Sequence, residues 1–331
     1  MSSKLFLLVL SLCVGAISSA GILNAGISSD VNDVKFYVYP SSTDRKEVIL
    51  DNVQSLDAIK SGVGVTLCID GFLSNAESPM SQLTKNSVLS KLSTPQNIIV
   101  VDWGRLSGNG NTFANLIETG AAYSKVLANV GPVGSRIADV INFIVTTKNI
   151  LPSQINIIGH SLGAHIAGAC GTFYRDRYGA LLSRISGLDP AGPFFNLQID
   201  VNKRLHSGDA AFVDIYNTNR GTLGDSSHQT GDINVYVNGG DNQPGCAEAD
   251  TSGFAGYCSH SYSWKFFDMT FHRNVEACPC VGLPCQCKSS CNTQCDSPII
   301  VGAGTSPSAR GAYHLIITDS LSQYPASVLQ V

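Results

Sequence analysis

The sequence has 331 residues, of which 44% are hydrophobic and 14% charged, with 21 basic against 25 acidic side chains. A charge so sparse and so nearly balanced argues against nucleic acid or an anionic membrane as the partner, and favours one that is uncharged or zwitterionic. A chain of this length can bury about three quarters of its unfolded surface in one large domain, with or without a small appendage.

The first 20 residues have the pattern of a secretory signal peptide. Lys4 precedes an apolar core over residues 5–17, and Ala20 ends a stretch of small residues suited to cleavage. This core is shorter than the roughly 20 residues that span a bilayer, so no transmembrane anchor is expected. The sequence therefore predicts a secreted, extracellular protein whose residues 21–331 form a single domain.

Beyond the signal peptide, apolar runs alternate with helical patterns. Strands are predicted over residues 64–70, 97–103, 155–159, 183–189 and 211–217. Helices are predicted over residues 78–92, 112–146 with a break near Gly131 and Pro132, and 161–177. Strands that are apolar throughout are typical of a parallel sheet with helices on both faces, so the expected class is α/β with right-handed crossovers. After residue 218 the periodicity fades, which predicts loops and short strands.

The cysteines are concentrated near the C-terminus. Of 11 cysteines, Cys13 lies in the signal peptide, and disulfides are expected among the other ten because secretion leads to an oxidising compartment. One segment holds six whose pairing the sequence leaves open: Cys278, Cys280, Cys285, Cys287, Cys291 and Cys295. A zinc cluster is the less favoured alternative because their spacing is irregular. Cys68 and Cys170 stand alone in apolar surroundings, which indicates buried thiols, or a pair if their elements touch.

Ser161 stands in the stretch INIIGHSLGAH, where an apolar strand stops and a helix begins. The pattern G-x-S-x-G is weak by itself, but this placement is typical of a nucleophile elbow, a sharp turn that exposes a serine hydroxyl. Gly159 and Gly163 allow strand and helix to approach closely beside it. The helix N-terminus adds N–H dipoles that favour developing negative charge. Ser161 is therefore predicted to be a catalytic nucleophile.

A nucleophilic serine needs a histidine as base and a carboxylate that orients it, and in this architecture the chain order is Ser, acid, His. Asp189, in GLDPAGP, ends the strand after the elbow and is preferred over Asp214, which lies in mid-strand and would face a helix layer. Five histidines follow the acid: His206, His228, His260, His272 and His314. Placement in loops favours His228 and His260, and a disulfide at Cys258 would anchor the loop that carries His260.

Several motifs in order resemble the pancreatic lipase family of animal lipases, especially its insect and venom phospholipase A1 branch. They are GHSLGAH, GLDPAGP, VDW at 101–103 and CSHSYSWKFF at 258–267, and the resemblance runs from about residue 30 to 325. It implies the α/β-hydrolase fold, secretion and hydrolysis of carboxylic esters of lipids. It also implies a catalytic triad of Ser161, Asp189 and His260.

The same resemblance implies the groups around the triad. Backbone N–H groups of Phe72, in IDGFLSN, and of Leu162 would form the oxyanion hole. Cys246 and Cys258 match the disulfide that closes the family's lid, here with 11 residues between them, whereas triacylglycerol lipases have a markedly longer lid. A short lid and the largely polar loop at 217–232 would leave a zwitterionic head group in water, which favours phospholipase A1 activity at the sn-1 ester over neutral-lipid hydrolysis.

Three features depart from the family. Asp70 stands where the family usually has His before the glycine of the oxyanion loop, and an ionised carboxylate there would oppose the oxyanion by about 3 kcal/mol. Asp70 must therefore point away, be paired or slow the enzyme, and Asp70→His is expected to raise turnover. The segment RLHSGDAAFVD resembles the family's calcium loop, but His206 stands at one carboxylate position and only Asp209 is carried over as a carboxylate ligand, so calcium is not predicted. No other metal or cofactor is expected. No C-terminal β-sandwich, and hence no colipase, is expected.

A catalytically silent lipid-binding or yolk-type protein is the rival class, because some insect relatives of this family have that role. Such a relative would be expected to have lost Ser161 or His260, and both are present. The sequence therefore favours an enzyme whose partner is a lipid substrate at an interface, either a phospholipid or a neutral lipid.

Overall fold

A computed structural model describes residues 26–92, 94–108, 121–197, 203–227, 230–252, 255–280, 285, 295, 297–317 and 321. Its strands are β1 (Lys35–Val38), β2 (Lys46–Val48), β3 (Val65–Ile69), β4 (Asn97–Asp102), β5 (Ile155–His160), β6 (Arg184–Leu188), β7 (Phe212–Asn217), β8 (Ile233–Val237), β9 (Val275–Pro279), β10 (Ile299–Val301) and β11 (Gly311–Leu315). They form an 11-stranded sheet in the order β10-β9-β11-β8-β7-β6-β5-β3-β4-β1-β2. Neighbours from β11 through to β4 pair in parallel, and only the outer pairs at each end are antiparallel.

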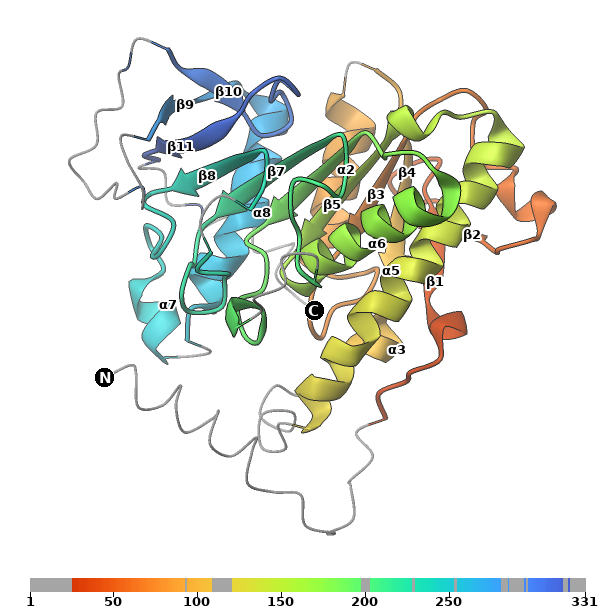
Figure 1. Cartoon of the computed structure of the whole chain (residues 1–331), viewed down its shortest axis with the longest axis horizontal. Coiled ribbons are helices and arrows are strands. Elements are labelled where there is room, and N and C mark those ends of the chain that lie inside the picture. The colour runs from red at the N-terminus through yellow and green to blue at the C-terminus, as the bar shows by residue number, and fades with distance from the viewer. Residues whose placement is uncertain are drawn as a thin grey trace.

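Helices cover both faces of this sheet (Figure 1). They are α2 (Pro79–Lys91), α3 (Gly104–Ser107), α5 (Ala121–Lys148), α6 (Leu162–Tyr178), α7 (Ala247–Ser252) and α8 (Tyr257–His272), with short 3₁₀ turns η1 (Val31–Asp33), η2 (Val53–Leu56), η3 (Pro152–Gln154) and η4 (Phe195–Leu197). Helices α5 and α6 pack on one face, and α2 and α8 on the other. Alternate residues of β3 enter the two cores, Leu67 and Ile69 on the α5–α6 side and Cys68 on the α2–α8 side. The predicted α/β class with a mostly parallel sheet is confirmed.

The five strands and two of the helices predicted from the sequence are present, but the break predicted near Gly131 and Pro132 is wrong. Helix α5 continues through Pro132 as one helix of 28 residues. Proline costs the helix a backbone hydrogen bond, but α5 packs against α6 over much of its length. The two backbones come so close that a Cβ on Gly134 would lie 2.7 Å from the Cβ of Ala169. Tertiary packing therefore outweighs the local propensity.

Helix α8 lies where only loops and short strands were predicted. Almost every residue between Ser259 and Thr270 is buried, since the helix is covered by the sheet on one side and by α2 on another. A helix buried all round has no polar stripe, so the sequence carries no 3.6-residue pattern to reveal it. The prediction that His260 lies on a loop is accordingly wrong, because it lies in the first turn of α8.

Disulfides confirm part of the cysteine prediction. Cys246 pairs with Cys258, Cys278 with Cys295, and Cys280 with Cys285. Cys287 and Cys291 lie outside the described residues, as does the predicted signal peptide.

Cys68 and Cys170 are free thiols, buried in the cores on opposite sides of the sheet. Burial raises the pKa of both thiols. Among the helices described, none is long and apolar enough to cross a membrane.

Candidate active site

Ser161 occupies the tight turn between β5 and α6. Its backbone has φ 55° and ψ −123°, a conformation that costs a non-glycine residue about 1–3 kcal/mol. Backbone hydrogen bonds hold the turn: the Ser161 N–H donates to the Leu188 carbonyl at 3.1 Å, and the Ser161 carbonyl accepts from Ala164 at 3.1 Å and from Ala191 at 3.2 Å. The strained elbow predicted from the sequence is thus the geometry observed.

The loop that follows β3 packs directly against this elbow. A Cβ on Gly163 would lie 2.1 Å from the Ile69 carbonyl oxygen, and a Cβ on Gly71 would lie 2.7 Å from the Cβ of Ser161. Only glycine permits these two approaches. They bring the loop that carries Phe72 beside the first turn of α6, whose N-terminal N–H groups, including that of Leu162, have no partner within the helix.

His260 and Asp189 are brought together although 71 residues separate them. The Nδ1 of His260 donates to Asp189 Oδ2 at 2.6 Å, and both side chains are buried. Asp189 Oδ1 accepts the backbone N–H groups of Thr218 at 2.8 Å and Asn219 at 3.0 Å. With the proton on Nδ1, the Nε2 of His260 is left as a proton acceptor. Burial, the largest effect, lowers the pKa of His260 despite its hydrogen bond to Asp189. The imidazole is therefore uncharged at neutral pH, and its Nε2 can accept a proton.

Asp214, the other candidate acid, is committed elsewhere. It pairs with Arg184 at 3.0 Å from Nε to Oδ1, and it accepts the hydroxyls of Ser186 at 2.8 Å and Tyr216 at 2.6 Å. This ion pair raises the pKa of Arg184 against the opposing effect of burial. Asp214 is therefore part of a buried structural network in the sheet, as its mid-strand position suggested.

None of the other candidate histidines that the structure describes forms a hydrogen bond with Asp189. His206 pairs with Asp209 at 3.1 Å, and His272 lies at the far end of α8 from His260, 3.6 Å from Asp268. His314 lies on β11, and His228 lies outside the described residues.

Asp70 proves to be paired, which is one of the three outcomes that the sequence left open. Its Oδ1 lies 2.9 Å from the Nδ1 of His160, the residue before Ser161. The His160 ring lies 4.6 Å from the His260 ring, between centroids. The expectation that Asp70→His raises turnover assumed an unpaired carboxylate, and this hydrogen bond removes its basis. The GHSLGAH motif contains His160, but the sequence did not reveal its pairing with Asp70, because the two residues are 90 positions apart.

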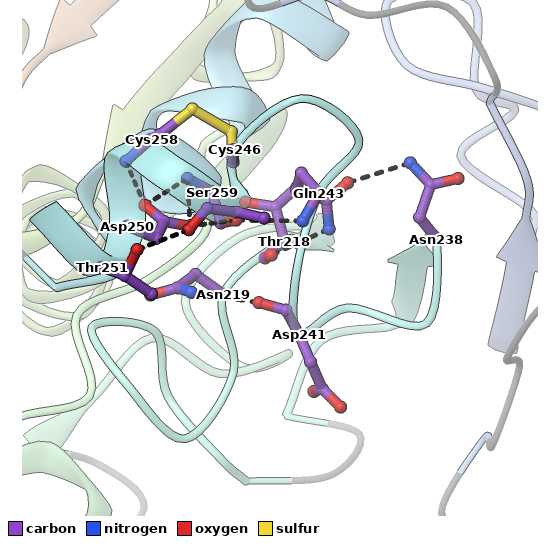
Figure 2. The surroundings of a disulfide bond; sticks show 11 residues. Thr218, Asn219, Asn238, Asp241, Gln243, Cys246, Asp250, Thr251, Cys258 and Ser259 are labelled. Carbon is purple, nitrogen blue, oxygen red and sulfur yellow. Dashed lines mark hydrogen bonds between the residues drawn. A yellow bond between two sulfur atoms is a disulfide. The ribbon is translucent and has the colours of Figure 1, made fainter. Parts of the chain in front are cut away.

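The segment closed by the Cys246–Cys258 disulfide supports the helix that carries His260 (Figure 2). Asp250 Oδ1 accepts the backbone N–H of Cys258 at 2.8 Å, and Asp250 Oδ2 accepts the Ser259 hydroxyl at 2.6 Å. The Cys258 N–H belongs to the first turn of α8, whose N-cap residue, Gly256, has no side chain to accept it. Asp250 thus caps α8 from outside the helix.

A second group of hydrogen bonds continues from Ser259 toward the residues that hold Asp189 (Figure 2). The Ser259 hydroxyl accepts the Gln243 N–H at 2.9 Å, and Gln243 Nε2 donates to the Thr218 carbonyl at 2.8 Å. Since the Thr218 N–H donates to Asp189, one network joins the disulfide-closed segment to both His260 and its carboxylate. Sequence reasoning missed Asp250 and Gln243, and nothing in the local sequence marks them.

In the segment that resembles a calcium loop, the Asp209 carboxylate accepts hydrogen bonds from protein groups. Asp209 accepts the Thr172 hydroxyl at 2.7 Å on one oxygen and the His206 backbone N–H at 2.9 Å on the other. Its hydrogen bond to the imidazole raises the pKa of His206. Among the residues that the structure describes, no group of three or more His, Cys, Asp or Glu side chains is placed to hold a metal.

A row of aromatic rings leads from the oxyanion loop to a groove. Phe72 contacts Tyr123 edge-on at 5.2 Å, and Tyr123 contacts Phe194 at 5.7 Å, between ring centroids. Phe194 lines a groove of about 350 Å³ between α5, α6 and the segment after β6, together with Val130 and Phe173. This path offers apolar surface to a long hydrocarbon chain.

Comparison with known proteins agrees with this geometry. The model of the Lipase family matches residues 22–295. This chain belongs to the Lipase family. The lipase is 33% identical over 241 residues to a phospholipase A1 of Polybia paulista, covering 71% of this chain and 70% of that one. It is 30% identical over 313 residues to phospholipase A1 4 of Polistes dominula, covering 89% and 92%. With lipase member H-A of Xenopus laevis it shares 36% over 191 residues, covering 57% of this chain and 37% of the relative.

Proposed function

We propose that this lipase is a secreted serine hydrolase that cleaves carboxylic esters of lipids. The hydrogen bond between His260 and Asp189, beside the elbow that carries Ser161, is the observation on which the proposal rests. His260 Nε2 removes the proton of the Ser161 hydroxyl as its oxygen attacks the ester carbonyl, while Asp189 holds the imidazole tautomer. The N–H groups of Phe72 and Leu162 stabilise the oxyanion, His260 returns the proton to the leaving alcohol, and water hydrolyses the acyl-enzyme by the same steps.

The proposed substrate is a phospholipid cleaved at its sn-1 ester, which is phospholipase A1 activity. The relatives from Polybia and Polistes that carry this name support it, and they align over most of this chain. Cys246 and Cys258 close a segment of only 11 residues, which holds the six-residue helix α7, and such a short cover would leave a charged head group in water. The groove lined by Phe194 is suited to the acyl chain.

Positional hydrolysis of a labelled lipid tests this proposal. Phosphatidylcholine labelled separately at sn-1 and sn-2 is offered beside emulsified triolein, and initial rates are compared. We expect release mainly from sn-1 and slower hydrolysis of triolein, with no release by Ser161→Ala. Faster triolein hydrolysis would identify a neutral-lipid lipase, and release mainly from sn-2 would contradict the substrate assignment.

A silent lipid-binding protein is the alternative from another class. It would bind phospholipid vesicles but hydrolyse neither lipid, and Ser161→Ala would bind as the wild type does. The buried and hydrogen-bonded pair of His260 and Asp189 favours the enzyme, because lipid binding alone does not require an imidazole held in one orientation as a proton acceptor.

Secretion is supported by the disulfides, which persist in oxidising compartments. Expression of the full chain in insect cells tests it. The protein is expected in the medium with Gly21 as its first residue, and retention in the cells with an intact Met1 would contradict the signal-peptide prediction.

A further inference from the structure

Two aspartate–histidine pairs lie at the nucleophile, and the proposed triad uses only one. Each aspartate accepts a hydrogen bond from an imidazole Nδ1, at 2.6 Å for Asp189 and His260 and at 2.9 Å for Asp70 and His160. The second pair is buried as well, with 9% of the Asp70 side chain and 8% of the His160 side chain exposed. A buried pair of this kind costs desolvation, so its position directly beside Ser161 calls for a role.

Asp70 connects the oxyanion loop, defined here as residues 70–72, to the strands on both sides of β3. Its Oδ1 accepts the Gly71 N–H at 2.7 Å in addition to the His160 ring at the end of β5. Its backbone carbonyl accepts the indole N–H of Trp103, which follows β4, at 2.8 Å. One residue therefore holds the loop to both neighbouring strands.

We propose that Asp70 and His160 are positioning residues that hold the oxyanion loop against the nucleophile, so that the Phe72 N–H is in place before Ser161 reacts. This inference rests on the proposed ester hydrolysis. Oxyanion donors act only when they lie about 2.7–3.1 Å from the oxygen as its charge develops. The loop packs closely against the nucleophile, since a Cβ on Gly71 would lie 2.7 Å from the Cβ of Ser161, and the pair holds the loop in that position.

The pairing with His160 also changes the effect that the Asp70 charge is expected to have on the developing oxyanion. Its carboxylate oxygen accepts two N–H donors, from Gly71 and His160, which stabilise its charge in place. Asp70 therefore does not stand as an unpaired charge beside the developing oxyanion.

Steady-state kinetics on a water-soluble monomeric ester, p-nitrophenyl butyrate, test the proposal. Asp70→Ala removes the oxygen that accepts both hydrogen bonds, and His160→Phe removes the Nδ1 donor but keeps a ring beside His260. Each is expected to lower kcat about 10- to 100-fold while KM changes less than about twofold, since the donor acts on the transition state.

The double variant is expected to be no slower than the slower single variant, because both changes break the same contact. Asp70→Asn keeps an acceptor oxygen, and its kcat is expected within about threefold of the wild type.

Asp232→Ala is the matched control. Asp232 also accepts a backbone N–H, from Val213 at 2.8 Å, and pairs with Arg310 at 3.3 Å. It directly precedes β8 and so lies at the amino ends of the parallel strands, whereas Asp70 directly follows β3 and lies at their carboxyl ends. It is expected to lower Tm without changing kcat. A wild-type kcat in Asp70→Ala, an additive double variant, or an Asp70→Asn as slow as Asp70→Ala would each overturn the positioning role.

Hydrogen–deuterium exchange separates this proposal from the proposed function. The peptide over residues 70–74 is expected to exchange faster in Asp70→Ala than in the wild type and Asp70→Asn, whether or not the protein hydrolyses esters. If the wild type lacks esterase activity but the variants show this exchange pattern, the proposed function is refuted while the positioning of the loop by Asp70 is supported. Unchanged exchange in Asp70→Ala would refute the positioning role.

Discussion

Gly163 and Ile69 approach each other so closely that a Cβ on Gly163 would lie 2.1 Å from the Ile69 carbonyl oxygen. The contact joins the nucleophile elbow to the end of β3, and a backbone carbonyl cannot move aside as a flexible side chain can. The geometry around Ser161 therefore depends on this one residue having no side chain.

Gly163→Ala is expected to destabilise the protein by about 1–3 kcal/mol, the usual cost of overpacking, and to lower kcat by displacing the oxyanion loop. Thermal unfolding and hydrolysis of a soluble ester measure both effects. Gly131→Ala is the matched control: a Cβ there meets nothing within 4 Å, and alanine favours the interior of α5 by up to about 1 kcal/mol. Equal Tm values for the two variants would contradict the steric argument.

Ser161→Ala is expected to lower kcat by at least about 10⁴-fold, because no other group on the elbow can form the acyl-enzyme. The fold should persist, since the backbone hydrogen bonds of the turn do not use the hydroxyl. Ester hydrolysis and the near-ultraviolet circular dichroism spectrum check the two statements. A variant that keeps most of its rate would exclude Ser161 as the nucleophile.

The activity should fall in acid as His260 takes up a proton. Its pKa is lowered from 6.5, mainly by burial, so kcat/KM is expected to decline with a midpoint below pH 6.5. Stability has the same sign: below pH 6.5 the unfolded chain binds a proton at His260 that the folded protein does not yet bind, so the free energy of unfolding falls as the pH falls. A midpoint above pH 6.5 would show that the His260 imidazole is stabilised in its charged form.

The two candidate acids should respond differently to substitution. Asp189→Ala is expected to lower kcat by about 10⁴-fold, because His260 loses the group that fixes its tautomer. Asp214→Ala leaves the buried Arg184 without its counterion and is expected to cost about 3–5 kcal/mol of stability. At a temperature where both variants are folded, Asp214→Ala should keep the wild-type kcat within about threefold. A reversed pattern would make Asp214 the catalytic acid.

Asp250→Ala tests whether the disulfide-closed segment supports the position of His260. Loss of the cap on α8 is expected to lower the free energy of unfolding by about 1 kcal/mol and kcat several-fold. Asparagine is also a good cap, so Asp250→Asn should keep the stability and the kcat of the wild type. Thr251→Ala is the control, because its exposed hydroxyl bonds only to carbonyls within α7. Thermal unfolding and ester hydrolysis of all three variants decide it, and equal values for Asp250→Ala and Thr251→Ala would exclude the cap.

The sequence alone determined the central sheet and the strand-to-helix turn that carries Ser161. Short apolar runs rich in β-branched residues are typical of strands covered on both faces, and Ser161 sits at a strand-to-helix boundary that two glycines mark. Asp189 could be placed at the edge of the sheet because it ends the next such run. These features are local, so they can be found from spacing and composition.

Only the tertiary structure decided which groups surround the serine. His260 lies on a helix buried on most sides, which has no periodic pattern, and Asp70 meets a histidine 90 residues away. Asp250 completes the first turn of a helix to which it does not belong. Such contacts join distant segments, and their energies depend on how the elements pack, which no local pattern of residues encodes.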